Sequence, residues 1–275
     1  MNSERKVAIV TGAGRGLGRA MAVGLLDHGI AVVAVDRDQA PLNELASAYG
    51  NAQLLTVAQD LTAPEAEEHV RAASLSAFGR IDILINNAGM GQSVVWPDHW
   101  VNPLRIWNIE IDEWKRFFEL NTHVTFRMSK MAMHLMMEQR WGRIINVTTS
   151  LGSMLRAGFG PYGASKAAAE SLTRIMAAEL EGSGVTANVL TPGGLTNTAA
   201  NPGAPFDRSK MIQPEVMVPP LLWLISDGAG SVNGMRFLAS HWDPLLPPEE
   251  SAKQAGAPAA WDAGISQPKE PERIG

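Results

Sequence analysis

The chain has 275 residues, of which 45% are hydrophobic and 19% charged, and its formal net charge is −5. The two signs of charge are interspersed, which argues against a basic nucleic-acid face or a membrane-binding stretch, and no apolar run approaches a membrane span. The absence of cysteine excludes disulfides and thiolate chemistry and fits a reducing compartment, so we expect a cytoplasmic protein with neither nucleic acid nor membrane as partner.

Short apolar runs alternate with helical patterns along the first third of the chain. The predicted strands cover 6–10, 31–36, 52–60 and 81–89, and the predicted helices cover 16–28, 41–50 and 63–79. Strands of this kind, separated by helices, are typical of a mostly parallel sheet that is covered on both faces.

The same alternation continues to about residue 240. Helices are predicted at 111–139 and from the segment around Tyr162 to about 181, and strands at 142–149, 185–194 and 234–239. The fold class is therefore α/β, with a doubly wound parallel sheet of about seven strands and helices on both faces.

The composition changes after residue 243. The segment 244–275 contains six prolines with many Ala, Glu and Lys residues and little periodicity. We expect one catalytic domain over 1–243 and a Pro-rich C-terminal tail that extends outside the core.

A glycine-rich turn, "TGAGRGLG", follows the first predicted strand directly. Gly12, Gly16 and Gly18 allow close approach of the backbone, and the N-terminus of the helix behind them attracts a pyrophosphate. The turn predicts a dinucleotide-binding site, although a glycine-rich turn alone is also compatible with an ordinary tight turn.

The second predicted strand ends in Asp36. An acidic side chain there accepts hydrogen bonds from the ribose hydroxyls of NAD and repels the 2′-phosphate of NADP. Arg37 beside it and Arg15 in the turn carry charge that is able to neutralise a phosphate. NAD is therefore the favoured cofactor and NADP the alternative.

Two further motifs join the glycine turn in the right order. "NNAG" ends the fourth predicted strand at 86–89, and Tyr162 and Lys166 form a Y-x-x-x-K pair. Together these motifs resemble those of the short-chain dehydrogenase/reductase family in its single-domain form, over roughly residues 5–240. The resemblance implies a doubly wound fold, a nicotinamide cofactor and a hydride-transfer site centred on a tyrosine.

The resemblance also assigns cofactor contacts along the chain. The implied set combines the glycine turn, the two strand ends and the loop after the sixth strand: Gly12, Arg15, Gly16, Leu17, Gly18, Asp36, Arg37, Asp60, Leu61, Asn87, Ala88, Gly89, Tyr162, Lys166, Pro192, Gly193 and Leu195.

The Tyr162–Lys166 spacing fits acid–base chemistry at a carbonyl. A carbonyl that receives a hydride needs a proton, and the reverse reaction needs a base, but the usual tyrosine pKa of about 10 is high for a base at neutral pH. Lys166 lies one helical turn away, so we expect its charge to favour the phenolate. The resemblance implies that Lys166 also holds the nicotinamide ribose and that Asn121 is the catalytic asparagine.

A hydroxyl near Tyr162 is needed to hold the substrate oxygen. Family members usually place a serine about thirteen residues before the tyrosine, where this chain has Thr149, and Ser150 follows it. Either Thr149 replaces the serine, or the loop is one residue shorter and Ser150 takes the role. The residue type slightly favours Ser150.

Two segments are candidates for the substrate site. An aromatic insertion at 96–110 carries Trp96 and Trp100, and its tryptophans suit a bulky or ring-shaped substrate, although packing of a surface loop is equally compatible. The segment 196–220 corresponds to the substrate lid of the family. Met154 and Phe159 are further candidates for the pocket.

The leading hypothesis is an NAD-dependent oxidoreductase that acts on a cyclic or hydrophobic secondary alcohol or ketone. The alternative is an NADP-dependent 3-oxoacyl-thioester reductase, and a catalytically inactive cofactor-binding scaffold is a remote third. The scattered histidines predict no metal site. The resemblance implies a homo-oligomer, a tetramer or a dimer.

Overall fold

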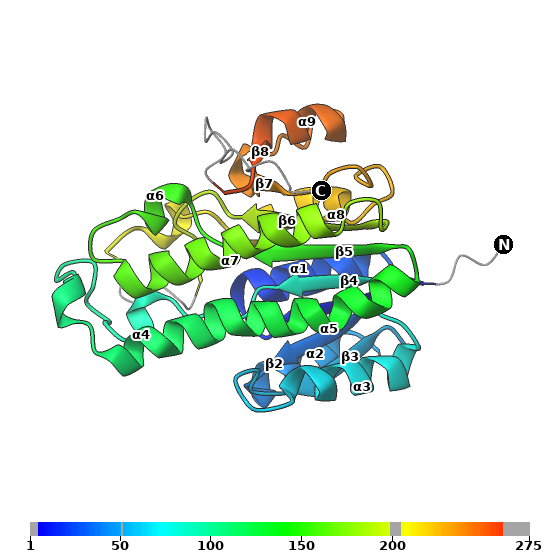
Figure 1. Cartoon of the computed structure of the whole chain (residues 1–275), viewed down its shortest axis with the longest axis horizontal. Helices are drawn as coiled ribbons and strands as arrows, with labels where there is room; N and C mark the ends of the chain where they lie inside the picture. The colour runs from blue at the N-terminus through cyan, green and yellow to red at the C-terminus, as the bar shows by residue number, and fades with distance from the viewer. Residues whose placement is uncertain (1–4, 51, 199–204, 261–275) are drawn as a thin grey trace, which may run out of the picture.

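The computed structural model describes residues 5–50, 52–198 and 205–260. Its strands form one sheet in the order β3-β2-β1-β4-β5-β6-β7-β8 (Figure 1). The strands are β1 (Val7–Thr11), β2 (Ala31–Asp36), β3 (Leu54–Ala58), β4 (Ile83–Asn86), β5 (Gly142–Val147), β6 (Val185–Thr191), β7 (Met235–Leu238) and β8 (Gly256–Pro258).

The order of the strands reverses between β1 and β4. The chain moves outward from β1 to β3 and then returns to place β4 on the other side of β1, with all of these pairs parallel. In open sheets of this kind, ligands bind at the carboxyl ends of the strands beside the reversal. The doubly wound prediction is confirmed, with eight strands in place of about seven.

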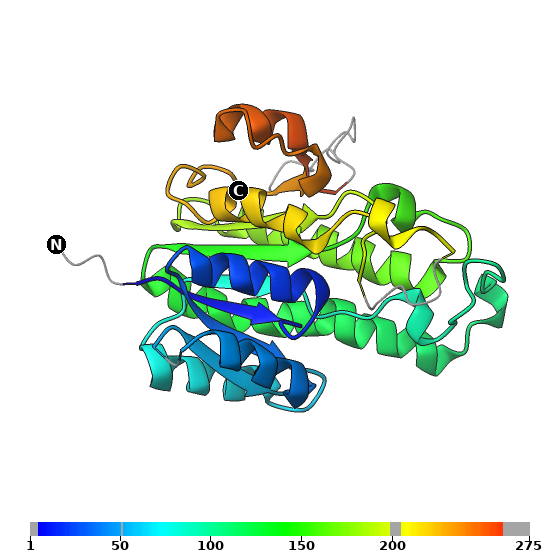
Figure 2. The same cartoon turned by 180° about the vertical axis from the view of Figure 1, so that it is seen from behind.

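Helices cover both faces of the sheet. The first face carries α1 (Gly16–Asp27), α2 (Gln39–Ala48) and α8 (Val218–Leu224), and the second carries α3 (Ala66–Phe78), α5 (Val124–Glu138) and α7 (Gly160–Glu179). Figure 1 shows α5 and α7 in front of the sheet. Figure 2, the view from the opposite side, shows α1 in front of the sheet.

Alternation along β1 shows why this strand carries apolar side chains toward both faces of the sheet. Ala8 and Val10 belong to the core under α1 and α2, whereas Val7 and Ile9 belong to the core under α3 and α5. Successive side chains of a strand point to opposite faces, so a strand covered on both faces has no polar side.

The predicted helix at 111–139 is interrupted. It consists of α4 (Ile111–Phe118), a turn of π-helix at Glu119–His123 and α5. A π-turn inserts one residue into the helical repeat, and such turns occur frequently at functional sites. The helical pattern of the sequence does not distinguish it from a continuous helix.

The C-terminal segment differs from the tail that the sequence predicts. α9 (Pro248–Ala255) and β8 lie inside that segment, and β8 pairs antiparallel with β7 at the edge of the sheet. Ala252, Ala255 and Ala259 are buried. Residues 244–260 are thus not an arm outside the core, because small residues among the prolines pack against the sheet edge; 261–275 lie outside the described residues.

Short helical turns fill the loops at the carboxyl ends of the strands. They are η1 (Gln92–Val94), η2 (Ile106–Asn108), α6 (Leu151–Met154), η4 (Arg208–Lys210), η5 (Pro214–Met217) and η6 (Ala239–His241). The predicted lid contains η4, η5 and the start of α8, and its residues 199–204 lie outside the described residues. No helix within the described ranges is long and apolar enough to cross a membrane.

Candidate active site

The glycine turn joins β1 to α1 at the carboxyl edge of the sheet. Gly12 and Gly16 have positive φ angles of 64° and 54°, a region that favours glycine. A Cβ atom on Gly18 would lie 2.0 Å from the carbonyl oxygen of Gly12, so the turn closes only without a side chain there. The turn therefore presents bare backbone and the N-terminus of α1 at this edge, as a pyrophosphate site requires.

The "NNAG" stretch holds this turn from the neighbouring strand. Asn87 Nδ2 donates to the carbonyl oxygens of Thr11 and Gly12 at 3.0 and 3.1 Å, and the Thr11 hydroxyl accepts from the backbone N–H groups of Asn87 and Ala88. A Cβ on Gly89 would lie 2.8 Å from Asn121 Oδ1 and 3.1 Å from Lys166 Nζ. This stretch thus connects the glycine turn to Asn121 and Lys166.

Asp36 lies at the end of β2 beside the same turn. Its carboxylate accepts from the backbone N–H of Gly14 at 2.9 Å and from that of Asp38 at 3.1 Å. Asp38 in turn lies 2.8 Å from a guanidinium nitrogen of Arg15 and 3.8 Å from one of Arg37. Sequence reasoning missed Asp38, whose carboxylate lies within ion-pair distance of both arginines near Asp36.

The remaining predicted cofactor residues lie at the same edge with different surroundings. Asp60 is exposed, and hydrogen bonds from Thr62 lower the pKa of its carboxyl, whereas Leu61 is buried in the core. After β6, the Pro192 carbonyl accepts from the backbone N–H of Ser240, and Leu195 pairs with the segment at Ile212. Gly193 has a φ of 91°, and Leu17 packs against the core beneath α1.

Thr149 and Ser150 have distinct roles in the structure. The Thr149 side chain makes a hydrogen bond with Tyr162. Ser150 is the N-cap of α6: its oxygen accepts from the backbone N–H of Ser153 at 3.1 Å and lies 2.9 Å from the Ser153 hydroxyl. The slight preference of the sequence analysis for Ser150 is therefore reversed, because Ser150 is engaged in capping the helix.

Lys166 lies within α7, one turn after Tyr162. It is buried, its Nζ donates to the carbonyl oxygen of Val147 at 2.9 Å, and burial lowers its pKa to about 8. Desolvation raises the pKa of Tyr162, and the hydrogen bond with Thr149 opposes this shift. The sequence predicts that Lys166 lowers the pKa of Tyr162. In this structure the pKa is raised instead, because desolvation is the largest effect.

Asn121 lies in the π-turn between α4 and α5 and is fully buried. Its Nδ2 donates to the Met90 carbonyl at 3.1 Å and to the Ser165 hydroxyl at 2.9 Å, and its Oδ1 accepts from the Met90 N–H. Ser165, which sequence reasoning missed, donates to the Tyr162 carbonyl at 2.9 Å. Asn121 therefore connects the "NNAG" loop to the turn of α7 that carries Tyr162 and Lys166.

Aromatic side chains approach Tyr162 from the insertion. Phe159 lies 6.3 Å from Tyr162 between ring centroids, and Trp100 lies 6.1 Å from Phe159. Phe206 of the predicted lid lies 5.4 Å from Trp100. The insertion, the segment before α7 and the lid thus meet in one aromatic cluster next to the tyrosine.

The other predicted pocket residues lie differently. Trp96 donates through Nε1 to the Asn102 carbonyl within the insertion itself. Met154 is buried at the end of α6, where its carbonyl approaches Gly163 of α7. Of the residues predicted for the pocket, Trp100 and Phe159 have ring contacts that lead to Tyr162.

Sequence reasoning missed two buried polar residues of this region. The His99 ring lies 4.8 Å from Trp100 and 5.7 Å from Phe159, and burial lowers its pKa. Its Nδ1 lies 3.0 Å from the Trp96 carbonyl, which only accepts, so Nδ1 carries the proton. Gln92 is 3% exposed, and neither its amide nitrogen nor its oxygen has a partner among the described residues.

The residues present fit an adenine dinucleotide with a nicotinamide end. A glycine-rich turn at a helix N-terminus, an acidic residue at the end of β2 and a buried lysine beside a tyrosine occupy one edge of the sheet. Within the described residues, no group of three or more His, Cys, Asp or Glu side chains is placed to hold a metal ion.

Comparison with known proteins gives a consistent family. A sequence profile of the short-chain dehydrogenases matches residues 6–205. The chain is 36% identical over 193 residues to the 3-oxoacyl-(acyl-carrier-protein) reductase FabG of Vibrio cholerae. This alignment covers 70% of this chain and 75% of that protein. It is 32% identical over 249 residues to a short-chain type dehydrogenase/reductase of Picea abies, with 83% and 88% covered.

The structure is also similar to solved structures. The 3-ketoacyl-(acyl-carrier-protein) reductase from Brucella melitensis, whose crystal structure is a complex with NADH, aligns with a TM-score of 0.75 and 28% identity. The alignment covers 86% of this chain and 96% of that one.

Proposed function

The chain belongs to the short-chain dehydrogenase/reductase family and is an NAD(P)-dependent oxidoreductase; on that premise we propose that it uses NAD to interconvert a bulky or cyclic secondary alcohol and its ketone. The observation that carries the proposal is the position of Tyr162 on α7, one helical turn before the buried Lys166, whose Nζ donates to the Val147 carbonyl at 2.9 Å. A hydrogen bond from the Thr149 side chain opposes the rise in the pKa of Tyr162. These groups lie at the carboxyl edge of the sheet, next to the glycine turn.

Each of the four polar side chains has a separate role in the proposed reaction. Tyr162 gives a proton to the substrate oxygen during reduction and takes it back during oxidation, while the Thr149 hydroxyl holds that oxygen near the phenol. The nicotinamide donates or accepts the hydride when it is bound. Lys166 supplies a positive charge one helical turn from Tyr162, and Asn121 fixes the loop and helix that carry these groups.

The charges around the turn support NAD. Asp36 faces the turn, and Asp38 pairs with Arg15 and Arg37, so neither arginine is left without a carboxylate to meet a 2′-phosphate. We therefore expect kcat/KM for NADH to exceed that for NADPH. The variant Asp38→Asn removes the carboxylate that pairs with both arginines and keeps Asp36. It should raise kcat/KM for NADPH.

The aromatic cluster supports a bulky substrate. Phe159 places an apolar ring next to Tyr162, Trp100 packs against Phe159, and Phe206 adds a further ring from the lid. A panel of cyclic and aromatic secondary alcohols with NAD, together with short linear alcohols, tests this directly. Equal kcat/KM for the linear and the ring-shaped alcohols would contradict the proposal.

The second candidate is an NADP-dependent 3-oxoacyl-thioester reductase. Its support is the name of the relatives, which include the reductase of Vibrio cholerae at 36% identity. A 3-oxoacyl thioester is assayed in the same panel with both cofactors. Preferential turnover of the thioester with NADPH favours this candidate, and tight NADH binding without turnover of any substrate favours the cofactor-binding scaffold.

We also propose a cytoplasmic homo-oligomer. Phe126 of α5 and Ile175 of α7 are about half exposed on helices that lie side by side on one face of the sheet (Figure 1). Exposed apolar side chains on two neighbouring helices support a contact between copies of the chain. Light scattering tests the oligomer, and Phe126→Glu with Ile175→Glu should reduce the mass to that of a monomer.

A further inference from the structure

A buried ion pair lies behind the hydroxyl-bearing segment of the site. Arg236 extends from β7, and its Nε lies 2.9 Å from Oε1 of Glu170 on α7. The two side chains are 7% and 0% exposed. Replacing such a pair by apolar residues is often neutral for stability, so stability alone does not account for it.

Both members of the pair contact the segment that carries Thr149. Arg236 Nη2 donates to the Thr149 carbonyl oxygen at 2.8 Å and lies 3.3 Å from Glu170 Oε2. Glu170 Oε2 also accepts from the Thr148 hydroxyl at 2.9 Å. The pair therefore fixes the backbone of Thr149 and the side chain of its neighbour.

Glu170 connects this segment to the helix of the catalytic residues. It lies four residues after Lys166 on α7, on the same helical face. Its second oxygen, Oε1, also accepts from the backbone N–H of Ala260 at 3.1 Å, just after β8. The segment after β5, the helix α7, the strand β7 and the C-terminal edge of the sheet thus meet at one carboxylate.

We propose that Arg236 and Glu170 are positioning residues that hold the Thr149 backbone so that its hydroxyl reaches Tyr162. The proposal rests on the proposed function, because it gives Thr149 a role in catalysis. The arginine suits this task, since its planar guanidinium donates to a carbonyl and meets a carboxylate at the same time. The Thr149 hydroxyl follows its backbone, and the pair thereby sets the distance between the hydroxyl and the phenol.

The test uses a variant that removes both charges. Arg236→Met with Glu170→Gln leaves no unpaired buried charge: the amide oxygen of the glutamine still accepts from the Ala260 N–H, and its amide nitrogen donates to the Thr148 hydroxyl oxygen. We expect kcat for the ketone to fall about 10- to 100-fold, with the Kd for NADH within about twofold of the original. Arg236→Lys, which keeps one donor for the Thr149 carbonyl, should recover part of kcat.

A double-mutant cycle with Thr149→Ala separates positioning from a general structural role. When the hydroxyl is absent, removing the pair should cause no further loss of kcat, because nothing remains to be positioned. Losses that multiply instead, or an unchanged kcat in the pair variant, would overturn the proposal.

A spectroscopic readout keeps this test independent of turnover. The chain has two tyrosines, so Tyr49→Phe leaves a single ring signal, that of Tyr162, in NMR of protein labelled with 13C at tyrosine Cζ. In the pair variant this signal should move to its position in Thr149→Ala, since both lose the same hydrogen bond. A signal that stays at the original position overturns the positioning role, whereas a shifted signal in a protein without turnover points to failure of the proposed function alone.

Discussion

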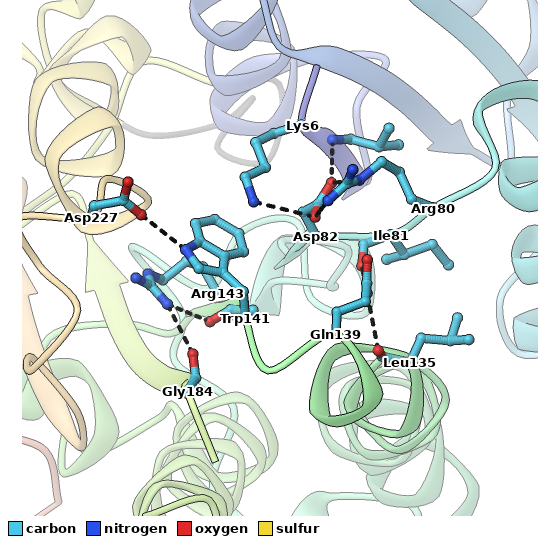
Figure 3. Close-up of polar contacts among 12 residues, drawn as sticks. Lys6, Arg80, Ile81, Asp82, Leu135, Gln139, Trp141, Arg143, Gly184 and Asp227 are labelled. Atoms are coloured by element: carbon cyan, nitrogen blue, oxygen red, sulfur yellow. Dashed lines mark hydrogen bonds and ion pairs between the residues drawn. The ribbon is translucent and has the colours of Figure 1, made fainter. Parts of the chain in front are cut away.

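At the amino ends of β1, β4 and β5, charged and aromatic side chains are paired with one another, except that the buried Nε of Arg143 has no partner among the described residues and burial lowers the pKa of its guanidinium. Asp82 is fully buried and accepts from the Val7 N–H at 2.9 Å and from two Arg80 nitrogens at 2.8 and 2.7 Å, with Lys6 Nζ at 3.7 Å (Figure 3). Trp141 has Lys6 3.7 Å and Arg143 4.4 Å from its ring, and its Nε1 donates to Asp227. Asp82 and Asp227 are thus both bound to neighbouring side chains of the chain itself.

At the carboxyl ends of the same strands, buried titratable and polar side chains lie in surroundings that disfavour their charged or hydrogen-bonded forms. Burial raises the pKa of Tyr162 and lowers that of Lys166 to about 8, and the buried amide of Gln92 has no partner among the described residues. Perturbed pKa values and unpaired buried groups are typical of functional sites. The contrast predicts that substitutions at the amino ends reduce stability, whereas substitutions at the carboxyl ends reduce activity.

The largest expected effect at the carboxyl end is that of Tyr162→Phe. Loss of the proton donor should lower kcat by about 100- to 10,000-fold, because general acid–base catalysis typically contributes that factor. The Kd for NADH, measured by fluorescence, should stay within about twofold. Tyr49→Phe is the control: its hydroxyl bonds Asp27 at an exposed position, so its kcat should be unchanged. Near-normal kcat in Tyr162→Phe would contradict the proposed mechanism.

Asp82→Ala is the corresponding test at the amino end. It leaves Arg80 and Lys6 without their carboxylate, and the loss of a buried charged acceptor should lower the free energy of unfolding by about 3 kcal/mol. Urea denaturation measures this change. Asp227→Ala, which removes one exposed hydrogen bond to Trp141, should cost less than about 1 kcal/mol. A kcat that falls in Asp82→Ala while stability is unchanged would break the distinction between the two ends.

Alanine substitutions at Thr149 and Ser150 sharpen the comparison within the site. Thr149→Ala removes the hydrogen bond with Tyr162 and should lower kcat about 10- to 100-fold. Ser150→Ala removes the N-cap of α6, so it should lower stability by about 1 kcal/mol and change kcat little. Kinetics and thermal unfolding of both variants decide the roles, and the opposite pattern would assign the catalytic hydroxyl to Ser150.

The pH dependence should report Lys166. With a pKa of about 8, the ammonium is present below that pH and is lost as the pH rises through it. We therefore expect kcat/KM for the cofactor to be level below about pH 8 and to fall about tenfold per pH unit above it. Burial raises the pKa of Tyr162, so its ionisation adds no change in this range. Lys166→Arg stays charged and should lack this decrease; a decrease at the same pH in that variant would assign it to another group.

The sequence predicts β1 and β2 well because each is an almost continuous apolar run. β1 and β2 follow their predicted ranges within one residue, and their side chains alternate between two cores as strands covered on both faces must. β8 was not predicted, since Pro258 and the prolines around it resemble a tail. α8 was also missed, because its prolines occupy the first turn, where a helix tolerates them.

The site was predicted by motif, but its contacts depend on three-dimensional register. Counting along the chain leaves Thr149 and Ser150 open, and the place where α6 begins decides between them. Glu170 and Arg236 are 66 residues apart, and their pairing follows from β7 lying next to β6. The capping role of Ser150 had a weak signal in the sequence, since serine is a preferred N-cap residue.

The smallest expected effect compares two glutamines at opposite ends of the sheet. Gln92→Met removes a buried amide without a partner among the described residues, so it should raise stability by about 1 kcal/mol. If that amide binds the polar part of substrate or cofactor, KM for one of them should rise about tenfold at similar kcat. Gln139→Met is the matched control, because its Nε2 donates to the carbonyls of Ile81 and Leu135 at the amino end. It should lower stability and leave both KM values unchanged. A Gln92→Met protein that is more stable with unchanged KM values would show that this amide takes no part in binding, and the contrast between the two ends would then rest on Tyr162, Thr149 and Lys166.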